Sequence, residues 1–161
     1  MHLEVIAEKR IQMIRTYSEL ITLPTYEERF KYLSLKGEVG KVTFGYDRYL
    51  NQILYNSTDW RMFRDKIILR DNACDLAHED HEIPSWRDKD GHLRGPKILI
   101  HHINPIMIDD VINRNPMVFD PENVITTILS THNAIHYGDE SLLSKIPIER
   151  LQNDTCPWKQ K

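Results

Sequence analysis

The residues that could do chemistry are histidines, and their spacing points to a metal ion. His132 and His136 lie four residues apart, so on a helix their rings share one face, one turn apart. The HExxH motif of zinc proteases has the same spacing, but it needs a glutamate after the first histidine, and Asn133 stands there. The protease interpretation therefore fails. Taken alone, the pair would more simply be two surface histidines.

A second pair, His101 and His102, changes that balance. Adjacent side chains on a strand point to opposite faces, so His102 would face away from a metal that His101 bound. A twisted strand end or a bulge could still aim both rings at one substrate from two sides. One imidazole would then help to hold a cation, and the other would take a proton from the attacking water. An unperturbed histidine pKa of about 6.5 suits that base near neutral pH.

Three segments together resemble the signature of the HNH nucleases, in their order and in their predicted secondary structure. They are His101-His102-Ile-Asn-Pro, Asp120-Pro-Glu-Asn123-Val-Ile-Thr and Thr131-His132-Asn-Ala-Ile-His136-Tyr-Gly, and the similarity covers about residues 74–138. The resemblance implies that His101, His132 and His136 bind a metal and that His102 is the general base. It also implies that Asn123 pins the loop between the strands through backbone hydrogen bonds and so orients His102.

The resemblance also implies a fold and an activity. We expect an α+β protein whose HNH ββα-metal core, a two-stranded antiparallel hairpin plus a helix, follows an N-terminal helical extension. The boundaries expected are 1–70 for the extension, 71–145 for the nuclease core and 146–161 for an irregular tail. The expected activity is metal-dependent hydrolysis of DNA phosphodiester bonds, by nicking or double-strand cleavage. Three imidazoles suit one Zn²⁺, Ni²⁺, Co²⁺ or Mn²⁺ ion better than Mg²⁺.

Many HNH proteins also hold a structural zinc between two CxxC pairs. Here the two cysteines, Cys74 and Cys156, lie far apart and in no such pair, so we expect neither a structural zinc nor a disulfide framework. The segment from Glu28-Arg29-Phe30 to Thr43-Phe-Gly-Tyr-Asp-Arg-Tyr-Leu-Asn-Gln52 resembles an extension of HNH proteins encoded by bacteriophages of Gram-positive hosts. This resemblance suggests a phage or prophage origin, with phage packaging (terminase) proteins and a second copy of the chain as candidate partners besides DNA.

Charge is unevenly distributed along the chain. Residues 1–70 carry 12 Lys/Arg against 9 Asp/Glu, whereas residues 71–161 carry 9 against 15. The half with the motif is acidic, so it needs bound cations before a polyphosphate can approach closely. The candidate DNA-binding cations are Arg61, Arg64, Arg94, Lys97 and Arg114. For the helical arginines, the alternative is a solvated helix face.

The first half of the chain predicts helices. Apolar residues share one face of a helix over 3–21, which Pro24 ends, and Thr25-Tyr-Glu-Glu is a capping box that opens a second helix through Leu33. The other elements expected here are a loop over 36–47, a helix over 47–55 and a helix over 60–69 that Ser57 or Asp59 caps.

The second half predicts strands around the motif. After a short polar segment over 74–83, the elements expected are a hairpin over 84–96 with a flexible tip at Asp90-Gly91, a strand over 97–103, a turn-rich connection over 106–121, a strand over 123–128 and a helix over 131–137. Ser130 is the expected N-cap of that helix, and Gly138 is its expected C′ residue.

Several alternatives stay open. His78, His81 and His92, with the acids Glu79, Asp80 and Glu82, could suggest a second metal site, but a polar hairpin explains them better because their spacing is irregular. The rival functions are a non-catalytic DNA-binding or packaging subunit and an RNase of the same fold. No apolar run approaches the roughly 20 residues of a membrane span. The charged N-terminus lacks the apolar centre of a signal peptide, so we expect the cytoplasm of a bacterial host cell.

Overall fold

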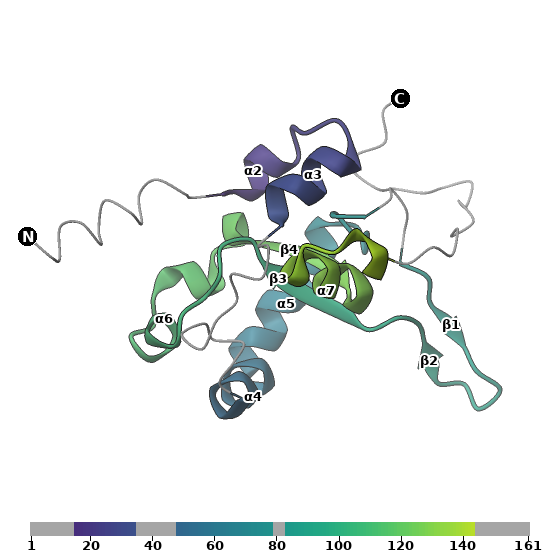
Figure 1. The fold of residues 1–161 in the computed structure, drawn as a ribbon. Coiled ribbons are helices and arrows are strands. Elements are labelled where there is room, and N and C mark those ends of the chain that lie inside the picture. Colours follow the sequence, from purple (N-terminus) through teal and green to yellow (C-terminus); the bar gives the residue numbers. More distant parts are fainter. Residues whose placement is uncertain (1–14, 35–47, 79–82, 144–161) are drawn as a thin grey trace, which may run out of the picture.

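The computed structural model describes residues 15–34, 48–78 and 83–143, and these form a mixed α+β structure (Figure 1). The described helices are α2 (Tyr17–Leu20), α3 (Tyr26–Leu33), α4 (Arg48–Asn56), α5 (Thr58–Arg70), α6 (Ile108–Ile112) and α7 (Leu129–Tyr137). The strands are β1 (Trp86–Arg87), β2 (Leu93–Arg94), β3 (Ile98–His102) and β4 (Val124–Ile128), in two antiparallel two-stranded sheets. Short 3-10 turns are η2 (Pro116–Phe119), η3 (Pro121–Asn123) and η4 (Glu140–Leu142). The expected α+β class with N-terminal helices is confirmed.

Local signals in the first half positioned most helices correctly. Thr25 and Glu28 form the predicted capping box of α3, and the Ser57 hydroxyl accepts the Trp60 N–H to begin α5. The helix predicted over 3–21 is wrong at its end, because Thr16 is extended and caps a new helix that begins at Tyr17. A threonine hydroxyl that accepts a backbone N–H competes with the helical ladder in this way. Residues 1–14, and the loop predicted over 36–47, lie outside the described residues.

The centre of the structure is the pair β3–β4. Its register runs without a bulge from Ile98 opposite Ile128 to His102 opposite Val124. On the far edge of β4, the carboxylate of Asp71 accepts the Thr126 N–H at 2.8 Å, and that of Asp75 accepts the Ile128 N–H at 3.0 Å. These buried acids satisfy strand N–H groups that would otherwise lack an acceptor.

The segment after α5 is therefore not the polar stretch that the sequence predicts. Cys74, Leu76 and Ala77 are buried, and the Leu76 N–H donates to the Thr126 carbonyl. The sequence did not indicate that this segment lies along the edge of β4. The Cys74 thiol is free and buried, whereas Cys156 lies outside the described residues.

The hairpin β1–β2 projects from the body of the molecule (Figure 1). Its tip is held together by Asp88, whose Oδ1 accepts the N–H groups of Asp90 and His92 and whose Oδ2 accepts Arg94 Nε at 2.7 Å. Gly91 has a φ of +82°, which favours glycine. The predicted turn is confirmed, but the tip is bonded into a defined conformation.

The elements that flank β4 differ from the predictions in two places. The connection over 106–121 contains α6, a helix that was not predicted because the segment is rich in turn-forming residues. Helix α7 begins at Leu129, directly after β4, and the Leu129 N–H donates to the Lys97 carbonyl. The predicted N-cap at Ser130 is therefore wrong, since Ile128 is the N-cap and the chain enters the helix two residues earlier. The predicted C-terminal glycine is confirmed, because Gly138 has a φ of +64°.

Two groups of buried side chains cover the two faces of β3–β4. On one side, α2, α3 and α7 contribute with Ile125 to a core made of Leu20, Phe30, Leu33, Cys74, Leu76, Ala77, Ile103, Ile125, Ala134 and Ile135. On the other side, α4 and α5 contribute with Ile100 and Val124 to a core made of Leu54, Trp60, Ile67, Ile100, Ile106, Val118 and Val124. None of the helices described is both long and apolar enough to cross a membrane.

Candidate metal centre

Three histidines converge between β3 and α7. His132 and His136 lie one helical turn apart on α7, with their Nε2 atoms 3.0 Å from each other. The His101 ring on β3 faces both, with centroid distances of 5.3 and 5.2 Å. One nitrogen from each ring lies within 4.8 Å of the other two. The structure thus brings together the three residues that the sequence predicted as metal ligands.

The polar atoms of this cluster lack ordinary partners. The His101 side chain is 1% exposed, and neither of its ring nitrogens has a hydrogen-bond partner. The buried Nδ1 atoms of His132 and His136 are also without partners. A buried polar group left unsatisfied costs about 1–3 kcal/mol, so an imidazole in this position is unfavourable unless something coordinates it. A cation between the three rings would satisfy one of the two ring nitrogens of His101.

Burial also sets the charge state of the cluster. It lowers the pKa of His101 well below its usual value, an effect that the charges of His132 and His136 reinforce. Burial followed by the charge of His132 lowers the pKa of His136 to about 4, and burial lowers the pKa of His132. All three rings are therefore neutral near pH 7, and neutral imidazole is the form that binds metals.

The donor set indicates the kind of metal that fits. Among the described residues, the cluster contains imidazole nitrogens and no carboxylate. Zinc–imidazole bonds of 2.0–2.1 Å in a tetrahedral site place the nitrogens about 3.3 Å apart, so small side-chain movements from the observed spacing suffice. Nitrogen donors favour Zn²⁺, Ni²⁺ or Co²⁺ over the oxygen-preferring Mg²⁺.

His102 lies on the opposite face of the strand pair from His101. The register of β3 contains no bulge, so of the two arrangements considered from the sequence, alternation of faces holds. The His102 ring is 8% exposed and stacks on Trp60, with centroids 5.5 Å apart and planes at 26°. The Nε2 atom lies 3.0 Å from the Val118 carbonyl oxygen.

That hydrogen bond defines the chemistry of the His102 ring. A carbonyl oxygen only accepts, so the proton of the neutral ring is on Nε2 and the lone pair is on Nδ1. Burial lowers the pKa of His102 to about 4, although the bond to Val118 opposes the shift. The unperturbed value of about 6.5 assumed from the sequence is therefore wrong, because the strand end is buried beneath α5. The ring is neutral near pH 7 and keeps its lone pair on Nδ1.

Asn123 ties the two ends of the loop between β3 and β4. Its Oδ1 accepts from the backbone N–H and the side-chain amide of Asn104 at 2.9 and 2.7 Å. Its Nδ2 donates to the Met117 carbonyl at 3.1 Å. Met117 directly precedes Val118, whose carbonyl holds His102. The contacts are those expected of a residue that fixes this loop.

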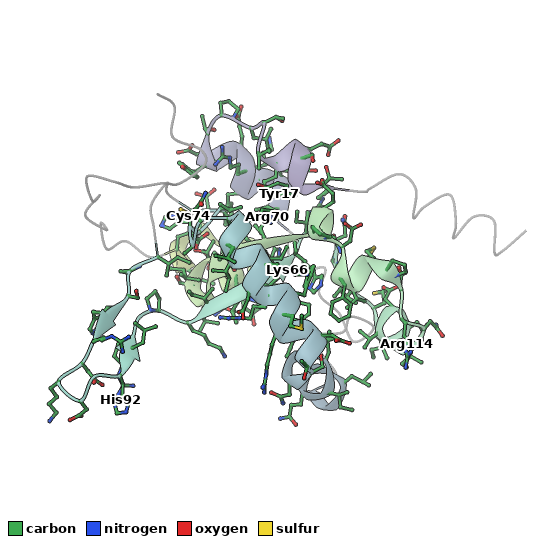
Figure 2. All side chains as sticks on the ribbon, turned by 180° about the vertical axis from the view of Figure 1, so that it is seen from behind. Tyr17, Lys66, Arg70, Cys74, His92 and Arg114 are labelled. Carbon is green, nitrogen blue, oxygen red and sulfur yellow. The ribbon has the colours of Figure 1, made fainter. Side chains whose placement is uncertain are left out.

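The candidate DNA-binding cations do not form one patch. Arg61 and Arg64 lie on α5, Arg94 on β2, Lys97 just before β3, and Arg114 after α6. Figure 2 shows Arg114 and the hairpin tip at His92 at opposite ends of the molecule. Among these cations, Lys97 is the one whose charge contributes to the lowered pKa of His132, for which burial is the larger cause. Arg94 is bound to Asp88 within the hairpin.

The histidines outside the cluster do not converge on a second centre in the described part of the chain. His92 approaches Asp88 and Asp90 at the hairpin tip, but Asp88 already accepts from Arg94 and from two backbone N–H groups. His78 is not part of that group. The remaining residues of the alternative site, Glu79, Asp80, His81 and Glu82, lie outside the described residues.

Sequence reasoning missed three groups that surround these histidines. The first is Trp60, and nothing in the sequence indicated that it contacts His102. Asn104 stands within the quoted motif, and its position two residues after His102 was the available signal. The carbonyl of Val118 has no signal in the sequence, since any residue supplies a backbone carbonyl.

Comparisons of the chain with protein-family models, with curated proteins and with solved structures found no match.

Proposed function

We propose that this chain is a metal-dependent endonuclease of the HNH (ββα-metal) type that hydrolyses DNA phosphodiester bonds. The observation that carries the proposal is the convergence of His101, His132 and His136 on one point, next to a fourth histidine, His102, whose Nδ1 keeps a lone pair. The antiparallel pair β3–β4 followed directly by α7 is the arrangement that the resemblance implies. The whole pattern supports a nuclease more than any single pair of histidines does.

Each of these residues would have its own role in the reaction. His101, His132 and His136 would hold one divalent ion, which would supply positive charge to the phosphate and to the leaving oxygen. His102 would accept the proton of the attacking water at Nδ1, because Nε2 is committed to the Val118 carbonyl. Asn123 would keep that carbonyl in place through its bond to the neighbouring Met117. Lys97, near His132, would contact the phosphate backbone.

A supercoiled plasmid provides the test of this function. The protein, freed of metal and then supplied with Zn²⁺, Ni²⁺, Co²⁺, Mn²⁺ or Mg²⁺, should give nicked or linear DNA with at least one of them, and EDTA should stop the reaction. An equal concentration of His132→Ala protein is the matched control for a contaminating nuclease. Competing RNA in the same assay tests the RNase alternative. Absence of any product with every metal would contradict the proposal.

One observation favours a second candidate, a non-catalytic DNA-binding or phage DNA-packaging subunit that retains the fold. His102 is 8% exposed beneath Trp60, and a base must reach water. The two candidates differ in the plasmid assay, because the subunit would bind DNA and leave it intact. One centre per chain cuts one strand, so double-strand cleavage would need a second copy of the chain or two successive nicks.

A further inference from the structure

The contact between Trp60 and His102 joins the N-terminal helices to the candidate base. Trp60 lies in the first turn of α5 and is 4% exposed. Its indole stacks on the His102 imidazole with the planes only 26° apart. Buried aromatic pairs at this distance hold a preferred mutual orientation. The His102 ring is thus fixed by a stacked neighbour on its face and by the Val118 carbonyl at its edge.

Trp60 is itself held by other rings. Tyr55, Phe63 and Phe119 have centroids 4.9, 5.6 and 5.9 Å from that of Trp60. Phe119 is the residue after Val118, and it also packs edge-on against Phe63. The aromatic cluster (Tyr55, Trp60, Phe63 and Phe119) therefore joins α4 and α5 to the loop whose carbonyl binds His102. Of the described rings in this cluster, Trp60 is the one that contacts His102.

These two contacts restrict different motions of the imidazole. The hydrogen bond to Val118 selects which nitrogen carries the proton, but one bond at one atom leaves the ring free to tilt. A stacked indole opposes that tilt from the face of the ring. Together they leave Nδ1 pointing in one direction. A base contributes to catalysis only when its proton-accepting atom lies within hydrogen-bond reach of the water, so the direction of Nδ1 matters to the rate.

We propose that Trp60 is a positioning residue for His102, so that helix α5 is part of the active site rather than an appended domain. This inference rests on the proposed nuclease function, but its structural part is independent of it. Trp60 does not touch the reacting atoms. It acts through the imidazole, by keeping Nδ1 available and Nε2 on the Val118 carbonyl.

Three variants distinguish a positioning role of Trp60 from a role in packing alone. Trp60→Phe keeps a smaller ring against His102, and Trp60→Met fills the space with a flexible chain that cannot stack as a ring. Phe63→Met is the matched control, because Phe63 packs in the same cluster and makes no ring contact with His102 in the described structure. Thermal unfolding shows how much each change destabilises the protein.

The first readout is kinetic. Trp60→Met should lower kcat on DNA about 3- to 10-fold, the effect expected from losing one stacked pair, with KM and metal affinity unchanged. Trp60→Phe should recover most of that loss. Phe63→Met should change kcat per folded molecule less than twofold. An equal fall of kcat in Trp60→Met and Phe63→Met would overturn the proposal.

The second readout needs no catalysis. In the zinc-loaded protein, long-range ¹H–¹⁵N correlations of the histidine rings should show His102 as a single tautomer protonated at Nε2, with through-space contacts to the Trp60 indole. Trp60→Met should give a mixture of tautomers, and Phe63→Met should not. A single Nε2-protonated His102 in Trp60→Met, or no contact to Trp60 in the parent protein, would overturn the positioning role. If the parent protein shows this signature yet cuts no DNA, the nuclease proposal fails and the positioning role stands.

Discussion

The Nε2 atom of His102 lies 3.0 Å from the carbonyl oxygen of Val118. This one bond defines the protonated nitrogen of the ring and leaves the other with its lone pair. The carbonyl belongs to a loop that Asn123 holds by its bond to Met117. The His102 ring on β3 is thus oriented by backbone that lies 16 residues later in the chain.

Removing the Asn123 side chain should disturb this loop. Asn123→Ala leaves the backbone N–H of Asn104 and the carbonyl of Met117 without a partner, whereas the side-chain amide of Asn104 keeps its bond to the Arg15 carbonyl. At about 1–3 kcal/mol for an unsatisfied group, we expect a clear drop in the free energy of unfolding and at least a tenfold loss of cleavage. Asn113→Ala, at an exposed position, is the control for both. Chemical denaturation and plasmid assays measure the two effects, and full activity in Asn123→Ala would contradict the assigned role.

Asp75 should make stability depend on pH in an unusual direction. Burial raises its pKa to about 6, although backbone N–H groups lower it in part. The folded state therefore binds a proton that the unfolded chain, with a carboxyl pKa of about 3.9, has released. Stability contributed by this group is present below about pH 4 and is lost as pH rises through about 6, by up to about 3 kcal/mol.

The measurement for Asp75 is a difference between two proteins. Asp75→Asn resembles the protonated side chain and does not titrate. The free energy of unfolding of the parent protein minus that of Asp75→Asn should fall between pH 4 and pH 7. Other titrating groups are the same in both proteins and cancel. A difference that stays constant over this range would show that Asp75 keeps an ordinary pKa.

Lys97 should contribute to DNA affinity through one phosphate contact. Its charge reaches His132, and its side chain is exposed. Lys97→Gln should weaken binding and make the slope of log affinity against log salt less steep by about 0.9. Fluorescence anisotropy with a labelled duplex, in a His102→Ala background, measures the slope without cleavage. Lys31→Gln on α3 is the control, and an unchanged slope in Lys97→Gln would remove Lys97 from the interface.

Local rules predicted only part of the three-histidine cluster. A helix puts residues four apart on one face, so the spacing of His132 and His136 was enough to pair them. His101 was assigned to them through the family resemblance, and the structure places its ring beside theirs. Thr25 and Ser57 likewise begin their helices through bonds to residues three positions away. Such contacts depend on short spacing, so they can be inferred from a single sequence.

The environment of His102 could not be predicted in the same way. Its partners, Trp60 and Val118, lie 42 positions before and 16 positions after it in the printed sequence. The acids Asp71 and Asp75 bind β4 more than 50 residues later. No local pattern marks such contacts. The burial that lowers the pKa of His102 depends on them, which is why the assumption of an unperturbed value was wrong.

The three-histidine cluster should bind one divalent ion per chain. His132→Ala or His136→Ala should raise the dissociation constant for Zn²⁺ at least about 100-fold, more than the roughly 10- to 100-fold typical of losing a group that only orients a ligand. His92→Ala, at the hairpin tip, should bind as the parent protein does. Isothermal titration calorimetry gives both affinity and stoichiometry. Unchanged binding in His132→Ala would place the metal elsewhere.

The most direct measurement of the central claim is the rate of plasmid cleavage by His102→Ala at matched metal occupancy. General bases contribute about 10²- to 10⁴-fold, so we predict at least a 100-fold lower rate than in the parent protein, with one bound ion in each. This result would separate the base, held by Val118, from the three ligands of the ion. Cleavage by metal-loaded His102→Ala at the rate of the parent protein would contradict the account.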